Sequence, residues 1–142
     1  MKKQLLLVAG LALLTSACAN LCETDCGVKS CKSGDVLATV NTSLFAFDSA
    51  KLTSGDQSAL KDAAATLNAD INADKTVTAK GYASTEGAAS YNVDLSRRRA
   101  EAVKAYLVGE GVADSRISVK GEGATTEFGA PKENRRVMVV VD

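Results

Sequence analysis

Between residues 36 and 141, segments with the hydrophobic period of a strand alternate with segments that have the period of a helix. This alternation constrains the fold most strongly. Residues 36–47 (VLATVNTSLFAF) alternate with period two and are rich in β-branched and aromatic residues. This pattern predicts a strand with Phe45 and Phe47 on one face, more often a core position than a site. Asp48 and Ser49 are expected to end the strand.

The next segment has the period of a helix. Ser54 is a plausible N-cap, because Gln57 three residues later completes a capping-box pattern. Apolar residues recur at helical spacing and predict a buried stripe: Leu60, Ala63, Ala64, Leu67 and Ile71. Asn72 and Asp74 are expected to end this helix, and residues 76–80 (TVTAK) alternate as a second strand.

A second helix is predicted over residues 90–110, after a loop at 81–87. One face carries Leu95, Ala102, Val103, Tyr106 and Leu107. Gly111 suits the left-handed position after a helix, with Val112 folding back onto Leu107.

Two further strands are predicted in the C-terminal part. Ile117 and Val119 alternate in a third strand, and residues 137–141 (VMVVV) form a fourth, apolar enough to be buried on both faces. The order β-α-β-α-β-β predicts an α/β fold with helices packed on a mixed four-stranded sheet. Strands joined by helices are expected to be parallel where they pair, and the last two to form an antiparallel hairpin.

The N-terminus has the pattern of an export signal. Lys2 and Lys3 precede ten apolar residues at 5–14, whereas a bilayer-spanning helix needs about 20. The sequence Leu14-Thr15-Ser16-Ala17-Cys18 resembles a lipobox, so residues 1–17 are predicted to be a signal peptide and Cys18 to be lipidated, for instance with palmitate. Ordinary cleavage after Ala17 and a buried helix are the alternatives. Ala19 favours the outer membrane over inner-membrane retention.

Three more cysteines follow within a predicted tether at residues 18–35. If Cys18 is lipidated, then Cys22, Cys26 and Cys31 form an odd set, which predicts a free thiol or a disulfide-linked homodimer. If it is not, two internal disulfides can form. The spacings C-x3-C and C-x4-C do not match the usual zinc pairs, so no metal is expected.

Composition excludes several classes of function. The 17 basic and 17 acidic residues balance, and removal of residues 1–17 leaves 15 basic and 17 acidic. A chain with this charge balance and no tryptophan lacks the excess of basic residues and the aromatic stacking residues that nucleic-acid binding uses. The absence of histidine excludes Ser-His-Asp and Cys-His catalysis, so neither an enzyme nor a cofactor is expected.

Several separated motifs resemble the OmpA-like peptidoglycan-binding family, of the peptidoglycan-associated lipoprotein type. They are FAFDSAKL at 45–52, YNVDLSRRRAEAV at 91–103, GV at 111–112 with RI at 116–117, GEG at 121–123 and NRRV at 134–137. Their order covers residues 36–142, the predicted domain.

The resemblance implies non-catalytic binding of the wall's diaminopimelate stem peptide, which tethers the outer membrane to peptidoglycan. That side chain ends in an ammonium and a carboxylate on one carbon atom, and arginine is the natural partner of the carboxylate. The resemblance assigns this role to Arg99, expected to be exposed beside the loop after the second strand. Asn92, two turns earlier on nearly the same face, would orient the loop or the ligand.

The sequence departs from the family pattern where an aspartate is expected to receive the ammonium. The family's Gly-His-Thr-Asp is Gly81-Tyr82-Ala83-Ser84 here, so Ser84 stands at the position of the carboxylate. Glu86, in the same loop, is a candidate replacement. Asp48 either contacts the ligand or caps a turn.

The other arginines near Arg99 and before the last strand can be explained without a ligand. Arg97, Arg98 and Arg99 are about 100° apart around a helix and must point in different directions; on their own they would be read as a solvated face. Arg135 and Arg136 are expected to pair within the fold.

Two other functional classes remain beside wall binding. The altered loop at 82–84 suits a protein-interaction module of an envelope or secretion complex. A wall hydrolase is the third class, but the sequence shows no obvious pair of catalytic carboxylates.

Overall fold

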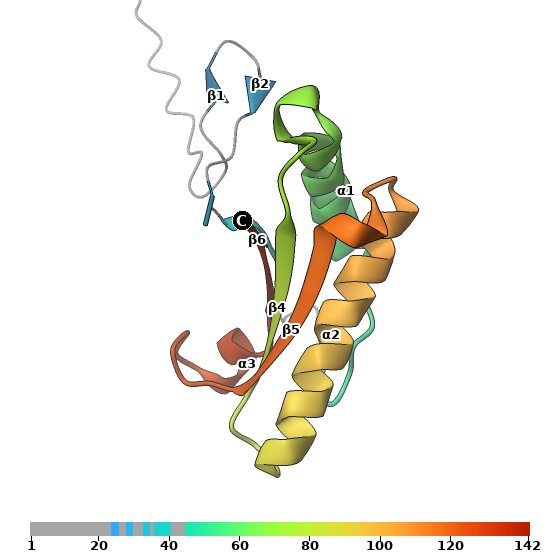
Figure 1. Ribbon diagram of the computed structural model, residues 1–142. Coiled ribbons are helices and arrows are strands. Elements are labelled where there is room, and N and C mark those ends of the chain that lie inside the picture. Colours follow the sequence, from blue (N-terminus) through green and yellow to red (C-terminus); the bar gives the residue numbers. More distant parts are fainter. Residues whose placement is uncertain (1–23, 26–27, 30–32, 35, 41–44) are drawn as a thin grey trace, which may run out of the picture.

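The computed structural model describes residues 24–25, 28–29, 33–34, 36–40 and 45–142 (Figure 1). The predicted signal peptide, Cys18, Cys22, Cys26 and Cys31 lie outside these residues. Within the predicted tether, β1 (Thr24–Asp25) and β2 (Val28–Lys29) pair as a short antiparallel ladder. In the described part of the chain, no helix combines the length and apolarity that a membrane crossing requires.

The main sheet has the order β3-β6-β4-β5. Its strands are β3 (Val36–Val40), β4 (Val77–Ala83), β5 (Ile117–Ala124) and β6 (Val137–Val141). β4 and β5 are parallel, whereas β6 pairs antiparallel with both β4 and β3. The predicted class, helices packed on a mixed sheet, is confirmed.

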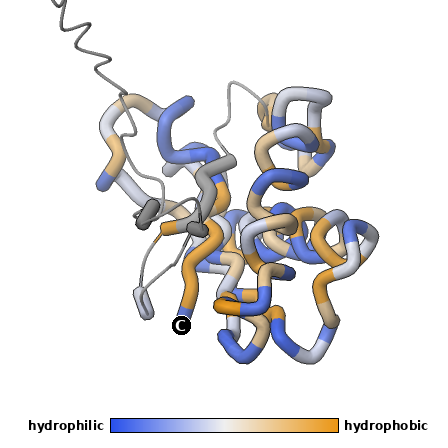
Figure 2. Tube along the Cα trace, turned by 90° about the horizontal axis from the view of Figure 1, so that it is seen from above, coloured by the Kyte–Doolittle hydropathy of each residue, from blue (hydrophilic) through white to orange (hydrophobic). Residues whose placement is uncertain are grey.

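The predicted hairpin between the last two strands is wrong, because β6 lies between β3 and β4 and does not pair with β5. The chain leaves β5, passes through the short helix α3 (Pro131–Asn134) and returns on the other side of β4. β5 lies at the edge of the sheet, where its polar residues Ser118 and Lys120 are exposed to solvent. The apolar β6, orange in Figure 2, is buried at four of its five residues and suits the interior of the sheet.

Two long helices cover one face of the sheet: α1 (Ser54–Asn68) and α2 (Ala89–Gly109) (Figure 1). The hydrophobic core lies between them and the strands. Its larger buried members are Phe45, Leu60, Leu67, Val77, Val103, Leu107, Val112, Ile117, Val137, Val139 and Val141.

Helix α1 begins one residue earlier than the capping pattern predicted. Thr53, not Ser54, is the N-cap, and its reciprocal partner is Asp56, whose carboxylate accepts hydrogen bonds of 2.9 Å from both the backbone amide and the hydroxyl of Thr53. The helix ends at Asn68 and is followed by a 3-10 turn, η1 (Asp70–Asn72). Ile71 therefore falls outside the buried stripe and is 47% exposed.

Helix α2 confirms the predicted stripe at Leu95, Val103 and Leu107, while Ala102 and Tyr106 lie at its half-buried margin. Gly111 has a φ of 95°, and the amide of Val112 donates to the carbonyl of Leu107 at 3.1 Å. This is the predicted left-handed cap. The following turn, η2 (Asp114–Arg116), leads directly into β5.

The first predicted strand is too long at its C-terminal end. β3 stops at Val40, and Phe45 and Phe47 do not belong to it. Ser49 donates a backbone hydrogen bond of 3.1 Å to the carbonyl of Ala46, and Asp48 has a φ of 55°, so residues 46–49 form a tight turn. Because the chain turns here, Phe45 is buried whereas Phe47 is 69% exposed, and the two rings do not share a face.

The predicted loop at 81–87 also begins too early, because β4 continues to Ala83. Gly81 pairs with Gly121 of β5 and with Val137 of β6. A glycine is required at this position, since an added Cβ would lie 1.9 Å from the carbonyl oxygen of Ser96 in α2. Close packing of α2 on this end of β4 places the helix beside the loop that follows the strand.

Candidate functional site

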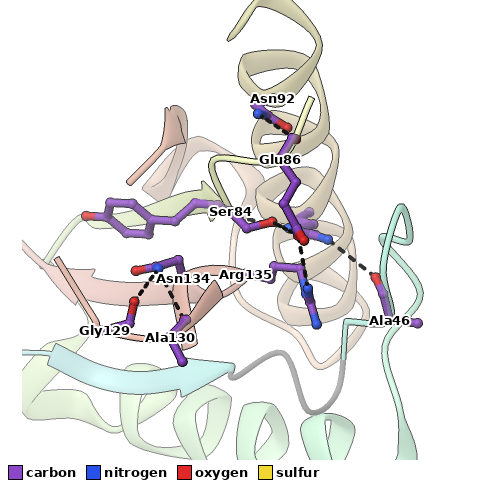
Figure 3. Close-up of polar contacts among 10 residues, drawn as sticks. Ala46, Ser84, Glu86, Asn92, Gly129, Ala130, Asn134 and Arg135 are labelled. Carbon is purple, nitrogen blue, oxygen red and sulfur yellow. Dashed lines mark hydrogen bonds and ion pairs between the residues drawn. The ribbon is translucent and has the colours of Figure 1, made fainter. Parts of the chain in front are cut away.

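Three segments that are far apart in the sequence meet at the C-terminal end of β4. They are the turn at 46–49, the loop at 84–88 with the N-terminal half of α2 that follows it, and the residues just before β6. Figure 3 shows the loop residues Ser84 and Glu86 between Asn92 of α2 and Arg135 of the segment before β6.

Arg99 lies beneath this junction and is fully buried, with no exposed surface. Its Nε donates to the carbonyl of Ser49 at 2.9 Å, its Nη1 to that of Tyr82 at 3.1 Å and its Nη2 to that of Ala46 at 3.4 Å. Its guanidinium also lies 5.3 Å from the centre of the Phe45 ring. The expectation that this side chain is exposed is therefore wrong. The turn and the end of β4 present backbone carbonyl groups, and the planar guanidinium donates hydrogen bonds to them.

The charge on Arg99 is retained despite this burial. Desolvation is the main cause that lowers the pKa of its guanidinium to about 10, and the neighbouring charge of Arg135 acts in the same direction. Asp48 opposes both effects by raising the pKa. At neutral pH the site therefore contains a buried cation.

Ser84 and Glu86 form a hydrogen-bonded pair in the loop after β4. The hydroxyl of Ser84, which is 5% exposed, donates to Oε2 of Glu86 at 2.9 Å. The same carboxylate oxygen lies 3.6 Å from Nη1 of Arg135 (Figure 3). The position that lacks the expected aspartate thus has a carboxylate beside it, supplied from two residues further along the chain.

Asn92 holds the loop rather than facing solvent. It is buried, and its side-chain amide donates to the carbonyl of Glu86 at 3.1 Å. Of the two roles expected for it, orienting the loop is the one with a contact in the structure.

Asp48 lies at the outer rim of the junction. Its carboxylate accepts a hydrogen bond from the hydroxyl of Tyr91, and the guanidinium of Arg98 lies 5.7 Å from the centre of the Tyr91 ring. Arg97 forms exposed ion pairs with Asp94 and Glu101, at 3.6 and 3.9 Å. The three consecutive arginines therefore point to three different environments, as the helical geometry predicts.

Arg135 pairs within the fold, with Glu86, as the sequence predicted, but the sequence interpretation did not include it among the site residues. Its side chain is 17% exposed, and its buried Nε has no hydrogen-bond partner among the described residues. The sequence feature that could have identified Arg135 is its position just before the buried strand β6, because a residue there lies at the edge of the core. Arg136 does pair within the fold, with the carbonyl of Glu133 at 2.6 Å and with the Phe128 ring at 4.1 Å.

Asn134 explains the local shape of the segment before β6. Its side chain accepts from the amide of Phe128 at 3.0 Å and donates to the carbonyls of Gly129 and Ala130 at 3.0 and 3.2 Å (Figure 3). This closed loop determines where the chain enters β6 and hence where Arg135 lies.

The arrangement suits recognition of a charged group better than bond cleavage. The guanidinium of Arg135 and the carboxylate of Glu86 are adjacent, with the buried charge of Arg99 acting on Arg135, which fits a ligand that carries both charges. Among the residues described, no group of three or more histidine, cysteine, aspartate or glutamate side chains could hold a metal ion.

The element order and the glycine-packed second helix define an OmpA-like α/β domain. The chain belongs to the OmpA family, whose model matches residues 44–137. A search of curated protein sequences found no significant match.

Solved structures agree with this assignment. The peptidoglycan-associated lipoprotein from Burkholderia pseudomallei is 25% identical with a TM-score of 0.65, over 73% of this chain and 89% of that one. The OmpA-like domain of FopA1 from Francisella tularensis is 24% identical with a TM-score of 0.64, over 85% and 93% of the two chains. The periplasmic domain of MotB from Helicobacter pylori is 16% identical with a TM-score of 0.64, over 80% and 79%. The last two show similarity of fold alone.

Proposed function

We propose that this domain binds peptidoglycan without catalysis, through the diaminopimelate side chain of the stem peptide, and links the outer membrane to the wall. One observation carries the proposal: Arg99 and Arg135 lie beside a carboxylate-bearing loop in an OmpA-family domain. Support also comes from the peptidoglycan-associated lipoprotein among the similar structures.

The ligand's carboxylate is proposed to contact Arg135, with the positive charge of the buried Arg99 behind it. Arg135 is partly exposed and offers the accessible contact. Arg99 contributes positive charge from below and holds the turn at 46–49 and the end of β4 together. A buried charge acts through a low local dielectric, so its attraction for an anion is stronger than that of a surface arginine.

The other proposed ligand residues form the walls of the site. Asn92 orients the loop through the carbonyl of Glu86, and the side chains of Ser84 and Glu86 form the wall on the side of that loop. Asp48 lies at the rim, where its contact with Tyr91 favours a supporting role.

Attachment to the membrane is proposed to depend on Cys18. One acyl chain gives only marginal membrane binding, whereas two or more give stable anchoring. Intact mass measurement of the mature protein tests lipidation at Cys18, and a non-reducing gel tests whether Cys22, Cys26 or Cys31 links two chains.

The central test compares two kinds of cell wall. The protein is expected to co-sediment with sacculi that contain diaminopimelate and not with sacculi that contain lysine at the same stem position, because lysine lacks the terminal carboxylate. Free diaminopimelate should compete for binding. Equal binding to both walls, or none to either, would contradict the proposal.

Protein interaction remains a second candidate, favoured by one observation. Glu86 is paired with Arg135 at the place where a wall peptide would have to bind. Crosslinking in the periplasm would then yield protein partners from an envelope complex instead of muropeptides.

A further inference from the structure

The loop after β4 carries its carboxylate in an unusual place. Residue 84, the buried position at the end of the strand, is an uncharged serine. The carboxylate of Glu86 folds back to it, so that Oε2 accepts the Ser84 hydroxyl at 2.9 Å. A negative charge is thereby brought next to position 84 without being attached there.

The backbone holds Glu86 in this position. The carbonyl of Glu86 accepts the Asn92 side chain at 3.1 Å, which joins the loop to the second helix. Gly87 follows with a φ of 92°, a left-handed conformation that residues with a Cβ rarely adopt. The loop is therefore tied to α2 at the carboxylate-bearing residue itself.

The carboxylate also retains capacity for a ligand. Its side chain is 50% exposed, and only Oε2 is engaged, with Ser84 and with Arg135 at 3.6 Å. Among the described residues, Oε1 has no hydrogen-bond partner. An ionised carboxylate accepts through both oxygens, so a second donor can bind without displacing Ser84.

The positions of the charges match a ligand whose two charges share one carbon atom. In such a ligand the ammonium and the carboxylate are separated by two covalent bonds, so the protein's anion and cation must also be adjacent. Glu86 and Arg135 satisfy this condition, and Arg99 adds a second cation nearby.

We propose that Glu86 is the specificity-determining anion of this site and receives the ammonium of the zwitterionic ligand, with Ser84 as a positioning residue. This inference depends on the proposed function, because it names the group that distinguishes a zwitterion from a simple carboxylate. The carboxylate has in effect been moved two residues along the loop.

The first experiment measures binding of sacculi containing diaminopimelate by three variants. Glu86→Gln is expected to weaken binding about tenfold, the difference between a charge-assisted and a neutral hydrogen bond. The double variant Ser84→Asp/Glu86→Gln should recover most of this loss, because it returns a carboxylate to the same place. Glu101→Gln, the same change at an exposed position on α2, should bind as the wild-type protein does.

A competition experiment gives a readout that a structural role would not change. Free diaminopimelate should displace the wild-type protein from sacculi far better than pimelate, which has the carboxylates but no ammonium groups. Glu86→Gln should discriminate between these two competitors less well. Thermal unfolding of each variant shows whether the fold is intact, which is expected because the Glu86 side chain is half exposed.

The outcomes separate this inference from the proposed function. Wild-type binding that Glu86→Gln leaves unchanged overturns the assignment of Glu86 and leaves wall binding standing. Tighter binding by Glu86→Gln shows that Glu86 competes with the ligand for Arg135 and also overturns it. Absence of wild-type binding overturns both.

Discussion

The Nε of Arg99 lies 2.9 Å from the carbonyl oxygen of Ser49, a residue 50 positions earlier in the chain. This contact joins the second helix to the turn before the first. Together with the bonds to Tyr82 and Ala46, it makes one buried side chain the connection between three segments. Arg99 therefore has a structural role whether or not a ligand is bound.

Replacement of Arg99 by alanine is expected to lower the free energy of unfolding by at least about 3 kcal/mol. The fully buried side chain would be lost and three part-buried carbonyl groups would lose their donor, at about 1–3 kcal/mol for each group left unsatisfied. Urea unfolding measures the change. Arg97→Ala is the matched control, because its ion pairs are exposed, and it should change stability by no more than about 0.5 kcal/mol. Equal effects of the two substitutions would contradict the structural role.

Replacement of Gly81 by alanine should prevent α2 from packing on β4. The new Cβ would lie 1.9 Å from the carbonyl oxygen of Ser96, a backbone atom that cannot move aside cheaply. Overpacking commonly costs about 1–3 kcal/mol, and the upper end or more is expected here. The change is measured as a lower thermal midpoint.

Gly109→Ala provides the control for that substitution, since nothing lies within 4 Å of its added Cβ. It is in the last turn of α2 and should stabilise the protein by up to about 1 kcal/mol. A destabilising effect as large as that of Gly81→Ala would show that close packing is not the cause.

Stability above pH 10 is expected to depend on Tyr82. Burial, followed by the charges of Glu122 and Glu127, raises the pKa of its phenol above the ordinary 10.0, while Lys120 opposes this. The folded state therefore favours the neutral phenol, and this contribution to stability is lost as pH rises from 10 through the raised pKa.

Tyr82→Phe isolates this effect, because phenylalanine keeps the ring that meets Phe128 at a centroid distance of 5.1 Å. Over that pH interval, the free energy of unfolding of the wild-type protein should fall relative to that of the variant. Subtraction of the two profiles cancels contributions from other groups, including the lowered pKa of Arg99, which acts with the opposite sign. Parallel profiles would contradict the prediction.

Arg116 is expected to hold the end of α1. Its guanidinium donates to the carbonyls of Lys75, Leu67 and Asn72 at 2.9, 3.1 and 2.6 Å. Arg116→Ala should accelerate hydrogen exchange in the last turn of α1 and leave the first turn, closed by Thr53 and Asp56, unchanged. Uniform acceleration along α1 would indicate global destabilisation instead of local opening.

The predictions that succeeded depended on local periodicity. The stripes of α1 and α2, the left-handed Gly111 and the apolar β6 follow from spacing and from conformational preferences within a few residues. The predictions that failed involved contacts between distant segments. The burial of β6 on both faces was predicted, but its place between β3 and β4 depends on which strands pair in space. The exposure of Phe47 depends on a turn stabilised by Arg99.

The sequence by itself determined the number and kind of the main elements, because periodicity is a local property, while its resemblance to the family supplied the residues expected to recognise a zwitterion. The tertiary structure alone decided that Arg99 is buried, that Glu86 reaches back to Ser84 and that Arg135 joins them. The physical reason is that burial and ion pairing depend on which segments meet in space. The site is formed by three segments that lie far apart in the sequence.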